Sequence, residues 1–546
     1  MVMIETSCPA RSLARAGFLA VMMTTAFPQG SVAGEASPLR LNPGASVEVN
    51  VAATAPVHLD AGARPGDYVA GVVDAGSSAA TLELLKDGKP VRRFFLEAAG
   101  RSDFRYVADQ GGAVLRVSTK GAAHVIVRLE KRIGVSEQGA PKAKLASPIM
   151  ADLAAKLAAG ERTDAFWRMV AEKGAPLVEP GPAGKATVTF LARGAKHGVR
   201  ILGAPSSDHD PMERLADSDV WFKTYLLPSS TRLSYKLAPD VPDFPGTERE
   251  RRVAILATAQ ADPLNRTPWP VEASDAYNQS STVSLPDAPA QPWIAPAGAH
   301  SGTLSSLTFA SEKLGNARDV TIYTPPDFNP ADPDTVLLFV FDGREYQSKV
   351  PTPLILDNMI AARVIPPTVA VFIPNIDGDA RATELPGNAT FADALAEELL
   401  PKVLAATSLR HSPAHTALAG SSFGGLASST IALRHPEAFG NVISLSGSYW
   451  WHPEGTEPAR DNHVATLVAS TPRRDLRFFL SAGLFESRGG GRPSILETNR
   501  HLRDVLEAKG YAVIAREYAG GHDYLVWRGA LSDGLLALFG TKGNRP

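Results

Sequence analysis

Hydrophobic and polar residues alternate along the first part of the chain, from about residue 38 to residue 134. Residues 46–51, 80–85 and 124–129 place an apolar side chain at nearly every second position. This period is typical of strands with one buried face, and residues 86–89 (Lys-Asp-Gly-Lys) are a hairpin signal between two strands. Short strands separated by turns predict a β-sandwich over residues 38–134.

A second β-rich region follows a linker and a helical segment. Residues 135–148 are mostly small or polar and include Gly and Pro, which is typical of a linker. Residues 149–173 carry apolar residues at helical spacing, and residues 184–286 return to alternating segments. We expect a second β-sandwich here, within a domain that spans residues 149–290.

The pattern changes again near residue 291. Short, mainly apolar runs now recur, at residues 336–341, 368–373, 416–419, 442–445 and 476–480. Helical patterns separate some of these runs, as at residues 391–405, and another follows the last run at residues 495–509. Apolar strands that alternate with helices predict a mostly parallel sheet with helices on both faces, over residues 291–546.

The charge balance limits the possible partners. Among 546 residues, 55 Lys and Arg oppose 57 Asp and Glu, which gives a net charge of −2. We therefore expect no nucleic-acid partner, because such partners require a positive field. A strongly charged substrate would have to be bound by local residues.

The first 33 residues have the pattern of a signal peptide. Arg11 and Arg15 precede an apolar run at residues 16–27, and small residues follow at positions 31–33. The run is too short to span a bilayer, and no later run is long enough, so we expect no membrane span. The protein would be periplasmic or secreted. The single cysteine, Cys8, lies within this segment, so the mature chain would form no disulfide.

Ser422 is the candidate nucleophile. It is the central residue of Gly420-Ser-Ser-Phe-Gly424, which fits the pattern G-x-S-x-G. The short pattern alone is common, but here a predicted strand precedes it and a predicted helix follows, which is the context of a nucleophilic serine in this motif. The strained turn of such a motif needs glycines where the backbone packs closely. Ser421 should point away from the cleft.

His522 and Glu486 are the candidate partners of Ser422. A serine hydroxyl needs an adjacent base, and in this fold the chain order is Ser, then acid, then His. His522 follows the last predicted strand, and Glu486 follows the strand before it. Glu486 would orient His522, while the neighbouring Asp523 would point elsewhere. The backbone N–H groups of Phe423 and Arg344 would form the oxyanion hole.

Several of these segments together resemble one known family. The segments are 341–344, 381–385, 420–425, 446–451 and 520–523, and they are similar to those of the enterochelin (ferric enterobactin) esterases, within the esterase-D-like α/β-hydrolases. Upstream, residues 166–167, 174–179, 187–191, 219–222 and 261–265 are similar to the family's own N-terminal domain. The resemblance covers roughly residues 150–540 and implies an α/β-hydrolase fold for residues 291–546. The sandwich at 38–134 looks like the pre-peptidase C-terminal type.

The resemblance implies a serine esterase that hydrolyses the trilactone of a catecholate siderophore. Iron would enter only as part of this small-molecule substrate, and we expect no metal site or cofactor and a monomeric protein. A ferric tris-catecholate is a trianion, so arginines would supply the local field. The candidates for this role are Arg344, Arg381, Arg488 and Arg528, and those for stacking on catechol rings are Tyr449, Trp450 and Trp451.

Two alternatives stay open at the level of sequence. The same catalytic residues could act on another ester, such as a feruloyl or acetyl group of a polysaccharide, with the β-sandwiches binding carbohydrate. A non-catalytic siderophore-binding protein is the other possibility, although Ser422, Glu486 and His522 argue against it.

Overall fold

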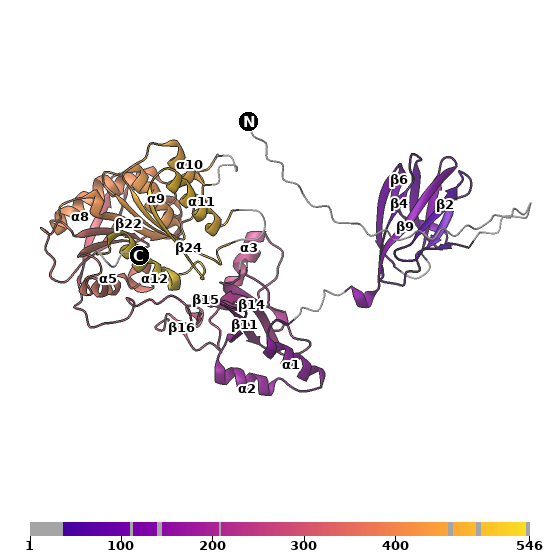
Figure 1. The fold of residues 1–546 in the computed structure, drawn as a ribbon, viewed down its shortest axis with the longest axis horizontal. Helices are drawn as coiled ribbons and strands as arrows, with labels where there is room; N and C mark the ends of the chain where they lie inside the picture. Colours follow the sequence, from indigo (N-terminus) through magenta and orange to yellow (C-terminus); the bar gives the residue numbers. More distant parts are fainter. Residues whose placement is uncertain are drawn as a thin grey trace, which may run out of the picture. The chain divides into compact units, whose positions relative to one another are not determined.

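The computed structural model describes residues 37–109, 113–138, 145–206, 209–456, 462–487 and 493–541. It divides into two compact units at residue 144 (Figure 1). The predicted signal peptide and Arg488 lie outside the described residues.

The first unit consists of two sheets that enclose one apolar core. One sheet has the order β1 (Leu39–Arg40), β3 (Val57–Asp60), β8 (Val114–Thr119), β5 (Ala80–Lys86) and β6 (Lys89–Ala98). The other has the order β2 (Ser46–Val51), β9 (Ala123–Ile133), β4 (Tyr68–Asp74) and β7 (Arg101–Val107). Leu82, Val117 and Val127 are fully buried in the core. In β2, β7 and β8 the period of two thus places alternate residues in this core.

The second unit begins with two helices and two further sheets. α1 (Pro148–Ala158) and α2 (Asp164–Lys173) replace the single helical segment that the apolar spacing predicts. They are separate because Gly160 has a φ of 88°, which ends a right-handed helix. One sheet has the order β10 (Leu177–Pro180), β11 (Lys185–Arg193), β14 (Val220–Pro228) and β13 (Glu213–Arg214). The other has the order β12 (Val199–Gly203), β15 (Arg232–Pro239), β17 (Ser280–Ser284) and β16 (Pro268–Trp269). The short helices α3 (Glu248–Val253) and η2 (Ala254–Ala257) follow β15.

An eight-stranded sheet forms the centre of the C-terminal domain, residues 291–546, which carries the candidate catalytic residues and is called the catalytic domain below. Its order is β18 (Thr303–Ser311), β19 (Asn316–Thr324), β21 (Thr368–Ile373), β20 (Val336–Phe341), β22 (Thr416–Ser421), β23 (Asn441–Leu445), β24 (Arg477–Gly483) and β25 (Ala512–Tyr518). The last six strands in this order, from β21 through β20 to β25, pair in parallel, whereas β19 pairs antiparallel with both β18 and β21. The carboxyl ends of the parallel strands therefore meet at one edge of the sheet.

Helices cover both faces of this sheet (Figure 1). α5 (Thr352–Ala361) and α12 (Tyr524–Phe539) lie on one face with the short α4 (Glu345–Ser348). The other face packs against α7 (Ala389–Ala394), η3 (Leu395–Leu399), α8 (Leu400–Thr407), α9 (Phe423–Arg434), α10 (His463–Ser470) and α11 (Ile495–Ala508). The short α6 (Gly378–Glu384) follows β21.

The two helical layers explain the continuous apolar runs in the sequence. Phe339 and Phe341 of β20 point into one core, while Leu338 and Val340 point into the other. A strand buried on both faces has no polar side to alternate with. The predicted α/β fold is confirmed. In the described part of the chain no helix has the length and apolar character that crossing a bilayer requires.

Candidate active site

Ser422 lies on the turn between β22 and α9. Its φ of 58° and ψ of −120° are uncommon for a residue with a side chain. The Ser422 N–H donates to the carbonyl of Leu445 at 3.0 Å, and the Ser422 carbonyl accepts from the N–H groups of Leu426 and Ser448, both at 3.1 Å. These three hydrogen bonds hold the backbone of Ser422 in a strained conformation of the kind found at functional sites.

The glycines of the motif are required by close backbone packing. A Cβ on Gly420 would lie 2.7 Å from the carbonyl carbon of Gly424, and a Cβ on Gly425 would lie 2.6 Å from Ser444 Oγ. Ser421 is 1% exposed and does not line the cavity described below. The turn therefore presents Ser422 to the cavity and buries Ser421, as the sequence predicts.

His522 and Glu486 come from neighbouring loops at the same edge of the sheet. His522 lies between β25 and α12, and Glu486 follows β24. His522 Nδ1 is 2.5 Å from Glu486 Oε1, and Glu486 Oε2 accepts a 2.6 Å hydrogen bond from the N–H of Gly483. The Glu486 side chain is 2% exposed and that of His522 is 38% exposed. A buried carboxylate thus fixes one imidazole nitrogen and leaves the other ring edge towards solvent.

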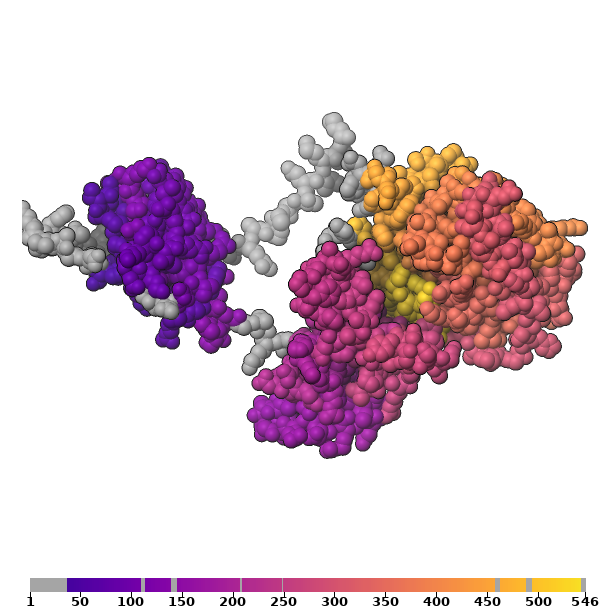
Figure 2. All heavy atoms as spheres, turned by 180° about the vertical axis from the view of Figure 1, so that it is seen from behind, coloured from indigo at the N-terminus to yellow at the C-terminus, as the bar shows by residue number. Residues whose placement is uncertain are grey.

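Ser422, Glu486 and His522 line one cavity of about 910 Å³. Its opposite wall comes from the domain that spans residues 149–290, here called the β-rich domain, through β12 and β15. Figure 2 shows a recess between the magenta β-rich domain and the orange part of the catalytic domain, with yellow C-terminal residues at its bottom. Ser422 Oγ lies 3.2 Å from Ser448 Oγ, and within the described residues no hydrogen bond joins Ser422 to His522. Catalytic hydrogen bonds are often long before substrate binds.

Two loops could supply an oxyanion hole beside Ser422. Phe423 begins α9, and Arg344 precedes α4 in the loop after β20. In the described part of the chain neither backbone N–H has a hydrogen-bond partner. A Cβ on Gly424 would lie 3.5 Å from Asp342 Oδ2, so the two loops pack against each other. This geometry is compatible with the predicted donors.

Arg381 has a different role from the one that the sequence suggests. Its guanidinium donates to both carboxylate oxygens of Asp342, at 2.6 and 2.8 Å, and lies over the ring of Phe423 at 5.8 Å. Arg381 does not line the cavity. Its charge neutralises a buried carboxylate, so we correct the prediction that Arg381 binds an anionic substrate.

Only one of the three predicted aromatic residues faces the cavity. Trp450 is 41% exposed and lines it. Tyr449 is fully buried, with its hydroxyl bonded to Ser429 and Ser444, both at 2.7 Å. Trp451 packs on the core beneath α10. The stacking role predicted for Tyr449 is therefore wrong, because its ring fills the interior. Trp451 is half-buried and does not line the cavity, so its stacking role stays a prediction.

Arg528 also lies away from the cavity. It donates to Gln291 Oε1 at 2.8 Å and sits over the ring of Trp269 at 5.7 Å. Burial, together with the nearby charge of Arg232, lowers the pKa of Arg528 to about 10. Arg528 thus joins α12 to Trp269 of the β-rich domain and does not line the cavity in which we predicted it to bind substrate. Of the other two candidate arginines, Arg344 is exposed and does not line the cavity, and Arg488 lies outside the described residues.

The β-rich domain contributes basic residues to the cavity that could not be predicted from the sequence. Lys236 and Arg252 line the cavity, together with His209 and with His452 of the catalytic domain. Lys236 donates to the carbonyl of Tyr277. No local motif marks these positions, because they reach the site only through the packing of one domain on the other.

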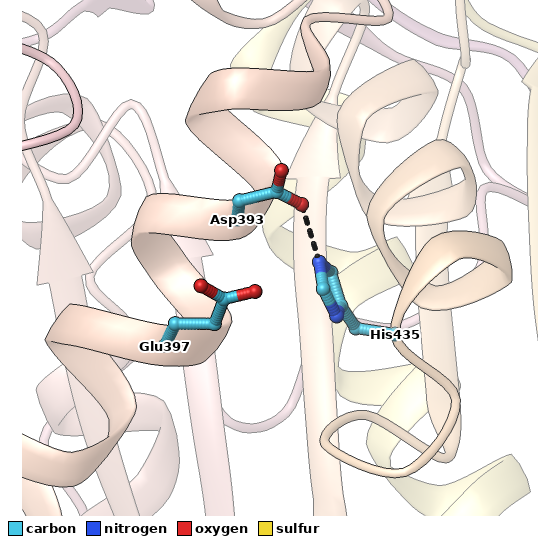
Figure 3. Close-up of side chains that lie close together, drawn as sticks. All are labelled: Asp393, Glu397 and His435. Carbon is cyan, nitrogen blue, oxygen red and sulfur yellow. Dashed lines mark hydrogen bonds and ion pairs between the residues drawn. The ribbon is translucent and has the colours of Figure 1, made fainter.

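A separate group of carboxylates and histidine lies between α7, η3 and the end of α9 (Figure 3). The ligand atoms of Asp393, Glu397 and His435 lie within 4.8 Å of one another. However, Arg434 donates to both oxygens of Asp393, at 2.5 and 2.8 Å, and Lys313 pairs with Glu397 at 2.8 Å. The geometry is that of an ion-pair network, since cations of the chain already contact both carboxylates.

Both domains of the second unit match known protein families. Residues 311–538 match the family described as "Putative esterase", and residues 187–294 match the family "Enterochelin esterase, N-terminal". The iron(III) enterobactin esterase of Dickeya dadantii is 32% identical over 428 residues, which is 71% of this chain and 95% of the relative. The iron(III) salmochelin esterase of Escherichia coli O6:H1 is 33% identical, over 72% of this chain and 98% of the relative.

A solved structure agrees with these matches. The ferric enterobactin esterase from Salmonella typhimurium has a TM-score of 0.57 and 31% identity, over 69% of this chain and 98% of its own. Fold and family together define a carboxylic ester hydrolase of the α/β-hydrolase class. The chain belongs to the family of the iron(III) enterobactin, or enterochelin, esterases. The family predicted from the motifs is thereby confirmed.

Proposed function

We propose that this chain hydrolyses the trilactone ester bonds of a catecholate siderophore such as ferric enterobactin. The observation that carries the proposal is the Glu486–His522 hydrogen bond, which lies on the same cavity as the strained turn at Ser422. Ser422 attacks the ester carbonyl while His522 takes its proton and then gives it to the leaving alkoxide. Glu486 holds the imidazole in the required orientation. Water, activated by His522, then releases the acyl group from Ser422.

The N–H groups of Phe423 and Arg344 would stabilise the oxyanion of each tetrahedral intermediate. A donor of this kind contributes about 2.7–4 kcal/mol to lowering the barrier. Both belong to the polypeptide backbone, so the contribution does not depend on the charge of the substrate.

The cavity suits a large, anionic and aromatic substrate. Its volume of about 910 Å³ is near the upper end of the roughly 300–1,000 Å³ of small-molecule sites. Lys236 and Arg252 offer positive charge to a ferric tris-catecholate, and Trp450 offers an exposed ring. The match to an enterochelin-type N-terminal domain favours this substrate over a polysaccharide ester. Iron would enter only as part of the substrate.

We also propose that the protein is exported, because residues 1–33 have the order of charged, apolar and small residues that signal peptidase recognises. Mass spectrometry of the protein purified from the periplasm or medium should show a chain that begins near residue 34. A chain that still begins at Met1 would contradict export.

The substrate is tested by comparing purified protein on three esters. These are a ferric catecholate trilactone, a feruloyl ester and a neutral p-nitrophenyl ester. The proposal predicts the highest kcat/KM on the trilactone. A higher value on the feruloyl ester would support the polysaccharide alternative, and binding of the trilactone without any turnover would support a non-catalytic carrier.

A further inference from the structure

The β-rich domain contacts the loop that carries His522 on both sides of this residue. The N–H of Arg232, on β15, donates to the carbonyl of Ala519 at 2.9 Å. Two residues further along β15, the N–H and the hydroxyl of Ser234 each donate to Asp523 Oδ2 at 3.0 Å. The segment between Ala519 and Asp523 is therefore attached to one strand at both ends.

Two glycines bring this segment against the β-rich domain. A Cβ on Gly520 would lie 2.8 Å from the carbonyl oxygen of Arg232, and a Cβ on Gly521 would lie 2.5 Å from the Cβ of Ala204. Such contacts leave no room for a side chain. The backbone just before His522 thus rests directly on the β-rich domain.

Asp523 also connects the β-rich domain to helix α12 of the catalytic domain. Its other oxygen, Oδ1, accepts from the N–H groups of Leu525 at 2.6 Å and Val526 at 3.3 Å, at the start of α12. One carboxylate therefore joins β15 to the first turn of α12, and His522 immediately precedes it. Any movement of Asp523 would move the imidazole relative to Ser422.

The loop that carries Glu486 makes a similar contact with the β-rich domain. Phe485, which precedes Glu486, packs against the core of the β-rich domain, and its N–H donates to the carbonyl of Gly520 at 3.1 Å. The loops of Glu486 and His522 are thus joined to each other and to the same domain.

We propose that Ser234 of the β-rich domain is a positioning residue for ester hydrolysis, which sets His522 over Ser422 through its hydrogen bonds to Asp523. The inference rests on the proposed roles of Ser422 and His522. The N-terminal domain of this family would then take part in catalysis, in addition to forming a wall of the substrate cavity.

The test measures kcat and KM on a neutral p-nitrophenyl ester, so that its result does not depend on the siderophore. Ser234→Ala should lower kcat by about tenfold and change KM less than twofold, because displaced catalytic groups slow the chemical step. Ser234→Thr, which keeps the hydroxyl, should restore most of kcat. Asp523→Asn should lower kcat at least as much, since its amide cannot accept the hydrogen bonds from Ser234 and from α12 together.

Thr224→Val is the matched control, because it removes another hydroxyl of the same domain, hydrogen-bonded to Thr189 at 3.0 Å. It should leave kcat unchanged. The proposal is overturned if Ser234→Ala and Asp523→Asn both keep the wild-type kcat, if threonine does not restore kcat, or if the control loses as much. If Ser234→Ala does not fold, the comparison of Ser234→Thr with Asp523→Asn decides the result. A positioning role predicts a near wild-type kcat for Ser234→Thr and a lowered kcat for Asp523→Asn, and equal kcat values would overturn the proposal.

Failure of the proposed siderophore substrate would give kinetic results that differ from failure of the positioning role of Ser234. A wild-type protein that hydrolyses the p-nitrophenyl ester but not the ferric trilactone would contradict the proposed substrate and leave the positioning test intact.

Discussion

Asp342 accepts both hydrogen bonds of the Arg381 guanidinium, at 2.6 Å from Nε and 2.8 Å from Nη2. Asp342 is 2% exposed, has a φ of 52° and lies two residues before Arg344. The ion pair therefore fixes the loop that carries one proposed oxyanion donor, and the ring of Phe423, the other donor residue, lies under the same guanidinium.

This ion pair predicts the behaviour of Arg381→Gln. Removal of one partner leaves a buried carboxylate poorly satisfied, which costs about 1–3 kcal/mol of stability or more. Because the loop serves every substrate, kcat/KM should fall by a similar factor on the ferric trilactone and on a neutral p-nitrophenyl ester. A loss confined to the ferric substrate would mean that Arg381 does recognise charge.

Lys236 should behave in the opposite way. Lys236→Gln should weaken binding of the ferric tris-catecholate by about 1.5–3 kcal/mol, the usual contribution of a hydrogen bond to a charged group. It should barely alter turnover of the neutral ester, and added salt should reduce the difference. The control is Lys223→Gln, whose lysine pairs with Glu213 and does not line the cavity. Equal effects of the two variants would argue against a role for Lys236 in recognition.

The two adjacent serines should differ sharply. Ser422→Ala should lower kcat by at least about ten-thousandfold, because it removes the hydroxyl that attacks the ester carbonyl. Ser421→Ala should keep most of the activity, since this side chain is buried away from the cavity. Kinetics on the p-nitrophenyl ester and thermal unfolding of both variants would check this. An inactive but folded Ser421→Ala protein would show that the nucleophile has been misassigned.

Glu486 and His522 should contribute unequally. Glu486→Gln should lower kcat by about 10³–10⁴, and His522→Ala by about 10⁶, because orienting the base matters less than supplying it. The comparison requires kcat at saturating substrate for both variants. Wild-type kcat in Glu486→Gln would remove Glu486 from the catalytic group, despite its 2.5 Å contact with His522.

The fold could be predicted where one physical requirement controls the sequence. The apolar run of β20 indicates burial on both faces, and the alternation in β2 indicates burial on one. The division of residues 149–173 into two helices could not be read from apolar spacing. It depends on the backbone of Gly160, and a glycine can also occupy the interior of a helix.

The site could be predicted in part for a similar reason. Ser422, Glu486 and His522 all follow parallel strands, and the ends of such strands meet at one edge of the sheet. The contribution of Lys236 and Ser234 depends on how one domain packs on another, which no local pattern records. Tyr449 was misassigned because an aromatic residue after a strand has the same local pattern whether its ring enters the core or a cavity.

The acyl-enzyme route through Ser422 is tested by product analysis of a ferric catecholate trilactone after incubation in water enriched in ¹⁸O. The acyl-enzyme route predicts linear products in which each opened ester carries one ¹⁸O in its new carboxylate, formed by the wild-type protein and not by Ser422→Ala. An intact trilactone with the wild-type protein, or the same products at the same rate with Ser422→Ala, would contradict ester hydrolysis through Ser422.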